Sequence, residues 1–364
     1  MVYTQICSWL DDFVGEDPPT ELLDIWDFNE WVGESEIIEV FNDVVIPTFN
    51  KNQTKEDAEA ILKSLLWEYY LFRRQSAIES IKDMSGNVSR IKSLNGTKQM
   101  GEAWLNEKKQ LLTASEFSKI LDHNRLSTIR SKLGTGIIFS DKYNPVVLTR
   151  GDGKINPMSW GYRYEPVVRS IFEKVNNCST CSDIGRVRHS VYKGLAASPD
   201  GIIIDGSKAG RLFELKAPYT RRLEEEIIPY EYYCQMQIQM EVFDVDAVEY
   251  FECSIVSVSS WENLEPKYMG AVAVTGDMDD FTTWIYEYSP IFPNDECGKE
   301  AVSDWLPEGN ILEKQVWAAQ SWQTMTVLRN KRWWSSIGEP QYLQYKKDLA
   351  AASIDPLYLK PRDF

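Results

Sequence analysis

The spacing of apolar residues along the chain predicts helices at both ends and in the centre. Spacings of three and four are typical of amphipathic helices. They predict one long helix over residues 57–84 and further helices over 160–175 and 232–243. Thr113 and Glu116 stand three apart, as in a capping box, so a helix is expected to start there.

Strand patterns occur between these helices. Apolar runs at Ile202–Ile204 and Leu212–Lys216 flank Asp205-Gly206, which predicts a β-hairpin. Two further runs, over 248–256 and 270–274, predict strands. The central part of the chain is therefore expected to have a mixed α/β fold.

These patterns divide the chain into three predicted segments. Residues 1–95 are an acidic, mostly helical N-terminal extension, which ends in a polar, turn-rich stretch. Residues 96–290 form the α/β core, and residues 291–364 a tryptophan-rich, helical C-terminal extension. The C-terminal extension is expected to contain a helix with these residues on one face: Val316, Trp317, Ser321 and Met325.

Charge is distributed unevenly along the chain. The formal net charge is −16, which is unusual for a protein that binds nucleic acid. Residues 1–50 contain twelve acids and no Lys or Arg, whereas residues 51–200 contain 24 basic and 16 acidic residues, a balance of +8. The field over a site in the basic part can therefore be positive. The acidic start is expected to lie either away from such a site or across it as a lid.

Composition excludes several classes of protein. No run of about 18 apolar residues is present, so no membrane-spanning helix is predicted. The first residues lack the basic and apolar regions of a secretory signal, and six scattered cysteines are typical of a reducing compartment. We therefore expect an intracellular protein that is not secreted. Only two histidines are present, which excludes a histidine-rich zinc site.

The predicted hairpin carries the most informative residues. Asp200 stands at the start of its first strand, and Glu214 and Lys216 point to one face of the second. Two adjacent carboxylates favour a divalent cation such as Mg²⁺ or Mn²⁺, which activates water for phosphodiester hydrolysis. The lysine can orient or deprotonate that water. The alternative is an exposed strand with alternating charges.

Two further polar residues lie on the predicted helices. Glu165 falls at the edge of an apolar helix face, where a carboxylate needs a cation or a metal ion. The alternative is an ion pair with Arg169, one turn later. Gln235 and Gln239 share one flank of the following helix, where they either reach into a cleft or mark a solvated edge.

Five of these segments together resemble the phage lambda exonuclease family, also called YqaJ-type viral recombinases or alkaline exonucleases, of the PD-(D/E)xK nuclease superfamily. The resemblance covers about residues 98–275. The matching segments follow the family's order: Trp104 to Glu116, Trp160-Gly-x3-Glu165, Ala197-Ser-Pro-Asp-Gly201, Glu214-Leu-Lys-Ala-Pro218 and Tyr233-Cys-Gln-Met-Gln237.

The resemblance implies a role for each matching residue. Metal ligands would be Asp200, Glu214, the Leu215 carbonyl and Glu165. Catalysis would also use Lys216, which orients the nucleophilic water, and Gln235, which supports the site. Phosphate or DNA would be bound by Lys108, Ser115 and Ser198. The family has an arginine at the position of Lys108, and a lysine binds phosphate without the two-pronged guanidinium.

The resemblance also implies a fold and an activity. The fold would be a restriction-endonuclease-like core, with a central mixed β-sheet flanked by helices and helical extensions. The activity would be a Mg²⁺-dependent 5′→3′ exonuclease that acts on the ends of double-stranded DNA and leaves 3′ single strands for recombination. Implied partners are a single-strand annealing protein and, in a homotrimer, further copies of the chain. Two alternatives are an endonuclease or RNA-degrading nuclease of this fold and an inert DNA-binding scaffold.

Overall fold

The computed structural model describes residues 74–94, 96–99, 102–121, 125–134, 144–149, 154–223 and 227–355, together with single positions at 64, 67, 68, 71, 72 and 358. The expectation that the acidic residues 1–50 lie away from the site or across it as a lid falls outside the described residues. The chain divides into two units, one made of residues 1–82 and 327–351 and the other of residues 83–326 and 352–364.

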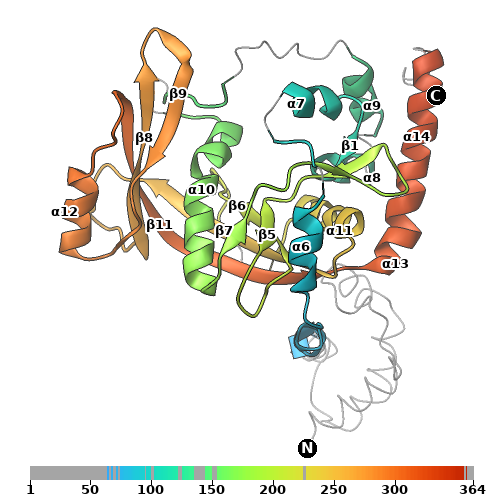
Figure 1. Cartoon of the computed structure of the whole chain (residues 1–364), viewed down its shortest axis with the longest axis horizontal. Coiled ribbons are helices and arrows are strands. Elements are labelled where there is room, and N and C mark those ends of the chain that lie inside the picture. The colour runs from blue at the N-terminus through green and yellow to red at the C-terminus, as the bar shows by residue number, and fades with distance from the viewer. Residues whose placement is uncertain are drawn as a thin grey trace, which may run out of the picture. The chain divides into compact units, whose positions relative to one another are not determined.

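The larger unit is built on a curved mixed β-sheet (Figure 1). Its strand order is β10-β8-β11-β7-β6-β5-β2, with β9 paired to β8. β6 and β7 are parallel, whereas β5 and β6 are antiparallel. The strands are β2 (Thr180–Cys181), β5 (Gly201–Ile203), β6 (Leu212–Lys216), β7 (Ala247–Ser257), β8 (Tyr268–Asp277), β9 (Asp280–Tyr288), β10 (Phe292–Pro293) and β11 (Ile311–Leu328).

Helices flank this sheet, and a small second sheet accompanies it. The second sheet has the order β1-β4-β3 and consists of Leu112–Thr113, Leu195–Ala197 and Val187–Arg188. The helices of the larger unit are α6 (Gly86–Lys92), α7 (Glu102–Lys108), η3 (Ala114–Glu116), α8 (Ser118–Leu121), α9 (Arg125–Leu133), α10 (Pro157–Asn176), α11 (Tyr230–Phe243) and α12 (Glu296–Asp304). The predicted α/β class with a flanked central mixed sheet is confirmed.

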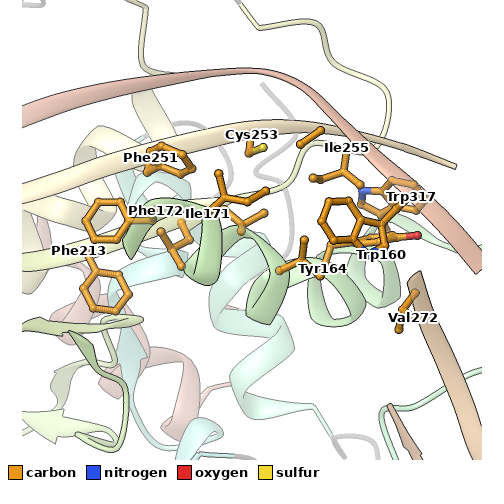
Figure 2. Packing of buried hydrophobic residues seen from close by; sticks show 14 of the residues in the cluster. Trp160, Tyr164, Ile171, Phe172, Phe213, Phe251, Cys253, Ile255, Val272 and Trp317 are labelled. Atoms are coloured by element: carbon orange, nitrogen blue, oxygen red, sulfur yellow. The ribbon is translucent and has the colours of Figure 1, made fainter. Parts of the chain in front are cut away.

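Helix α10 covers one face of the sheet and forms the main core with it. Its start is fixed by Asn156, whose side chain accepts a hydrogen bond from Ser159, and by Pro157 at the first helical position. Phe172 of α10 stacks on Phe213 of β6 and meets Phe251 of β7 edge-on, with ring centroids 5.4 and 5.5 Å apart (Figure 2). This packing anchors the helix that carries Glu165.

The tail contains a long strand where a helix was expected. Residues 311–328 form β11, which pairs with β8 and lies beside β7. The helical expectation for residues 316–325 is therefore wrong. Trp317 and Ala319 belong to the α10 core, whereas Val316 packs on the cluster beside α12. Because both faces are covered, the strand lacks the alternation that would separate it from a helix.

The segment between the N-terminal part and the core also differs from expectation. Described residues 74–79 are helical, and the helix does not continue to residue 84. The turn-rich stretch that follows contains α6 instead. Arg90 of α6 donates to the backbone carbonyls of Phe243 and Asp244 at 2.8 and 3.0 Å, so tertiary contacts stabilise a helix that its polar sequence does not predict.

In the smaller unit, the described C-terminal residues are helical. They form α13 (Lys331–Trp333), a π-helical turn (Trp334–Gly338) and α14 (Glu339–Ile354), which is shared with the larger unit. No helix among the described residues is long and apolar enough to cross a membrane. The five described cysteines are free thiols.

Candidate active site

Asp200 and Glu214 face each other across the predicted hairpin. Gly201 pairs with Phe213 in the antiparallel register, which places Asp200 opposite Glu214. The Leu215 backbone N–H donates to Asp200 Oδ2 at 2.7 Å. Gly201 allows this close packing, because a Cβ there would lie 2.4 Å from the Cys181 carbonyl oxygen. The hairpin thus fixes two carboxylates side by side.

Glu214 is buried and fully engaged by polar groups. Its carboxylate accepts hydrogen bonds from Gln235 Nε2 at 2.6 Å and Gln239 Nε2 at 2.7 Å, and it forms an ion pair with Lys216. Both glutamines come from the same flank of α11, one turn apart. The alternative of an exposed strand is therefore wrong for Glu214, which is 1 % exposed.

Lys216 lies between the carboxylates and an aromatic ring. Its Nζ is 4.6 Å from the centroid of Tyr232, a cation–π contact. Burial alone would lower the pKa of the Lys216 ammonium, but the charges of Glu214 and Asp200 outweigh it and raise the pKa. The lysine is thus held as a cation at the site.

The site disfavours the ionised forms of Asp200 and Glu165. Burial, together with the charges of Glu214 and Glu165, raises the pKa of Asp200 well above its usual range. The Glu165 side chain is exposed, yet the surrounding protein and the charge on Glu214 raise its pKa as well. The alternative, an ion pair of Glu165 with Arg169, is not formed among the described residues, and Arg169 donates to Ser182 instead.

These residues line one cleft of about 240 Å³. Its walls come from α10, β6, α11 and the start of β5, and it contains Glu165, Asp200, Leu215, Lys216 and Tyr232. No group of three His, Cys, Asp or Glu side chains in the described part of the chain forms a ready-made metal cage. A Mg²⁺ ion needs only one or two carboxylates, because water and phosphate supply the rest. Asp200, Glu214 and the Leu215 carbonyl fit this requirement.

A second pocket adjoins the cleft and shares Asp200 with it. This pocket measures about 160 Å³ and brings together the three predicted phosphate-binding residues, Lys108, Ser115 and Ser198. Gln235 also lines it. Ser198 accepts a hydrogen bond from Gln99 at 2.7 Å. The two neighbouring cavities are therefore lined by the residues of the predicted site except Glu214, which is buried behind them against Lys216 and Gln235.

Sequence reasoning assigned no role to two residues of the second pocket, although Trp104 begins one of the matched segments. Arg186 and Trp104 line it together, and the guanidinium lies over the indole ring at 4.1 Å. The two residues are 82 positions apart in the sequence, so no local pattern links them. Gln239 carried a signal, its spacing from Gln235, although its contact with Glu214 needed the structure.

A third cavity lies on the other side of Glu165. It measures about 530 Å³ and is formed by α10, β9 and the segment 144–149. Its lining includes four aromatic side chains, Tyr162, Trp284, Tyr286 and Tyr288. This cavity leaves Glu165 open to solvent on that side.

The central part of the chain, which contains this site, matches a known protein family. A model described as the YqaJ-like viral recombinase domain matches residues 103–246. Residues 103–246 are thus similar to the YqaJ-like family. The YqaJ-like domain contains every predicted site residue, from Lys108 to Gln235. Its segments Pro199-Asp200 and Glu214-Leu-Lys216 form the PD-(D/E)xK pattern.

The chain is also similar to a viral protein. An uncharacterized protein of Acanthamoeba polyphaga mimivirus is 28% identical over 190 residues, covering 48% of this chain and 32% of the relative. The chain thus spans about a third of the length of that relative.

Among solved structures, two exonucleases are similar. An alkaline exonuclease from Laribacter hongkongensis has a TM-score of 0.40 and 15% identity, covering 71% of this chain and 100% of the other. A phage-related exonuclease from Haemophilus somnus has a TM-score of 0.36 and 11% identity, covering 67% of this chain and 96% of the other.

Proposed function

We propose that this chain is a Mg²⁺-dependent exonuclease that degrades double-stranded DNA from 5′ ends and leaves 3′ single strands. The observation that carries this proposal is the cluster of Asp200, Glu214 and Lys216, of which Asp200 and Lys216 line one cleft together with Glu165 of α10. The YqaJ-like family of the central domain supports it. A single-strand annealing protein would be the partner that takes up the exposed strand.

Each residue of the cleft has a role in this proposal. Asp200, Glu214 and the Leu215 carbonyl would hold the metal ion, and Glu165 would hold a water molecule beside them. The bound cation supplies Lewis acidity toward the phosphoryl oxygen and the attacking water. Lys216 orients that water and balances the negative charge that develops on the phosphate. Gln235 and Gln239 keep the Glu214 carboxylate in place through their hydrogen bonds.

The neighbouring pocket favours attack at a strand end. Lys108, Ser115 and Ser198 offer a cation and two hydroxyl groups, which suit a phosphate. Because this pocket shares Asp200 with the cleft, a terminal phosphate held there places the first internal phosphodiester beside the carboxylates. This arrangement selects a strand end over an internal position.

The test is digestion of linear duplex DNA with Mg²⁺, with covalently closed circles as a second substrate. Wild type should release mononucleotides from the linear duplex and leave circles intact. Lys216→Ala should lower the rate by at least ~10²-fold, the usual effect of losing one charge-stabilising group. Lys193→Ala removes an exposed lysine from the same domain and should not change the rate.

Each alternative predicts a different result in this assay. An endonuclease would cut the circles. An RNA-degrading nuclease would act on RNA and leave both DNA substrates intact. An inert scaffold would bind DNA without hydrolysing it in Mg²⁺ or Mn²⁺. Removal of the metal ion with EDTA should abolish digestion, and added Mg²⁺ should restore it.

A further inference from the structure

Three cavities adjoin one another at the candidate site. The phosphate pocket, which is lined by Lys108, Ser115 and Ser198, shares Asp200 with the catalytic cleft. The cleft in turn shares Glu165 with the third cavity, of about 530 Å³. A strand whose terminal phosphate lies in the phosphate pocket and whose scissile bond lies in the cleft is therefore able to continue into the third cavity.

The walls of the third cavity are largely aromatic. The rings of Tyr162 on α10 and Tyr286 on β9 have centroids 6.1 Å apart, and the rings of Tyr286 and Tyr288 have centroids 6.2 Å apart. Trp284 of β9 also lines the cavity. Tyr162 is 36% exposed, so a ligand can reach its ring. Aromatic rings bind nucleobases by stacking, and every base has a face that can stack.

Hydrogen bonds within the protein hold this aromatic wall in place. The Asn144 side-chain amide donates to two backbone carbonyls of β9 at 2.8 and 2.9 Å. The indole N–H of Trp284 donates to the Asp277 carbonyl oxygen at 2.8 Å. The Tyr288 hydroxyl donates to the Arg163 carbonyl oxygen at 2.8 Å. Because these donors are used within the protein, the cavity offers a ligand mainly ring faces, which bind bases with little sequence preference.

The charge of the cavity favours a base over a phosphate. Among the described residues that line it, Glu165 is the single acidic or basic side chain. Arg163 of the same helix is 2% exposed and pairs with Glu313 at 2.7 Å. A phosphate in the cavity would meet a carboxylate without a compensating cation, which is unfavourable. An uncharged base avoids this cost.

We propose that the third cavity binds, by stacking, the base of the nucleotide on the 3′ side of the scissile bond. This inference rests on the proposed nuclease function and adds a base-binding subsite to it. Trp284, Tyr286 and Tyr288 lie outside residues 103–246, so most of the aromatic wall comes from beyond the family match. At a paired end, this base must leave the double helix, which costs least where pairing is weak.

The test uses 5′-phosphorylated duplexes in which the second nucleotide of the cut strand is either normal or abasic. Release of the first nucleotide by wild type with Mg²⁺ should be about tenfold slower in kcat/KM on the abasic duplex, because one stacked base is lost. A mismatch at the second nucleotide keeps the base and removes its pairing, so it should not lower kcat/KM. An abasic nucleotide about ten positions further along the strand should have no effect.

Substitutions in the aromatic wall should remove this sensitivity. Trp284→Leu and Tyr162→Leu should be slower on the normal duplex and should show a smaller ratio of kcat/KM between the normal and abasic duplexes. Tyr162→Phe keeps the ring and should therefore keep the ratio. Trp305→Leu is the matched control, because Trp305 is also half-buried but packs on the cluster beside α12. This control should keep the wild-type ratio.

A binding measurement separates this inference from catalysis. Without metal ion, wild type and Trp305→Leu should bind a short 5′-phosphorylated single strand about tenfold more tightly when its second nucleotide carries a base. Trp284→Leu should bind the normal and abasic strands more nearly equally. Equal Kd values of wild type for the two strands, or equal digestion of the two duplexes, would overturn the base-binding subsite and leave the nuclease function standing. A wild type that prefers the strand with the base but digests no DNA would instead contradict the proposed function.

Discussion

At the scale of single residues, the ion pair of Glu116 and Lys132 holds the segment that presents Ser115. Glu116 accepts hydrogen bonds from the Thr113 backbone N–H and hydroxyl and pairs with Lys132 at 2.8 Å. Burial would raise the pKa of Glu116, but Lys132 and Thr113 outweigh it and lower the pKa. Burial also lowers the pKa of Lys132 despite the pair, so the net stabilisation is modest.

This pair predicts a pH-dependent stability. Because the pKa of Glu116 is lower in the folded state, its contribution is present above the unfolded pKa of about 4.3 and is lost as the pH falls through the folded pKa. At pH 7, Glu116→Gln should lower the free energy of unfolding by about 1–3 kcal/mol. The difference from wild type should shrink toward pH 3 in urea titrations.

Glu296→Gln provides the control for that experiment. Glu296 pairs with Lys299 at 2.8 Å, but its side chain is 87% exposed, so the pair should contribute little. A Glu116→Gln variant as stable as wild type at pH 7 would show that the buried pair contributes nothing.

At the scale of elements, residue spacing within one segment predicted helices and strands, whereas features that depend on contacts between distant segments were not predicted. The hairpin of β5 and β6 and the helices α10 and α11 followed from spacing within each segment, and with them came Asp200, Glu214, Lys216 and Gln235. The strand β11 did not, because its two faces are covered by elements distant in sequence. Arg186 was missed for the same reason, since its contact with Trp104 spans 82 residues.

The packing of β11 on β8 gives a prediction at this scale. Gly270 pairs with Trp317, and a Cβ at residue 270 would lie 2.5 Å from the indole ring. Gly270→Ala should therefore destabilise the protein by about 1–3 kcal/mol through overpacking. In the double variant with Trp317→Phe, the smaller ring should relieve this cost, so the two effects on unfolding should not add.

Gly161 is the matching control for this glycine. A Cβ there meets no atom within 4 Å, and residue 161 lies inside α10. Gly161→Ala should thus stabilise the protein slightly, by about 0.5–1 kcal/mol, because alanine favours a helix. Strictly additive effects of Gly270→Ala and Trp317→Phe would contradict the proposed contact.

At the scale of the whole molecule, the net charge has the same sign as that of the proposed substrate, DNA. The net charge is −16, and residues 1–50 contribute −12 of it, so the remaining chain carries −16 + 12 = −4. The cations that line the phosphate pocket, Lys108 and Arg186, lie in the basic part of the sequence. Repulsion between the acidic start and DNA acts over a Debye length, about 8–10 Å at ordinary ionic strength.

Deletion of residues 1–50 should therefore tighten DNA binding at low salt. The measurement is the Kd for a duplex in the Lys216→Ala background, which prevents digestion, from about 50 mM salt upward. The affinity gain should shrink as salt screens the charges. A full-length variant with the twelve acids of this segment changed to Asn or Gln should reproduce the gain, since its cause is charge and not chain length. Equal affinities of all three proteins at every salt concentration would show that the acidic segment does not act on bound DNA.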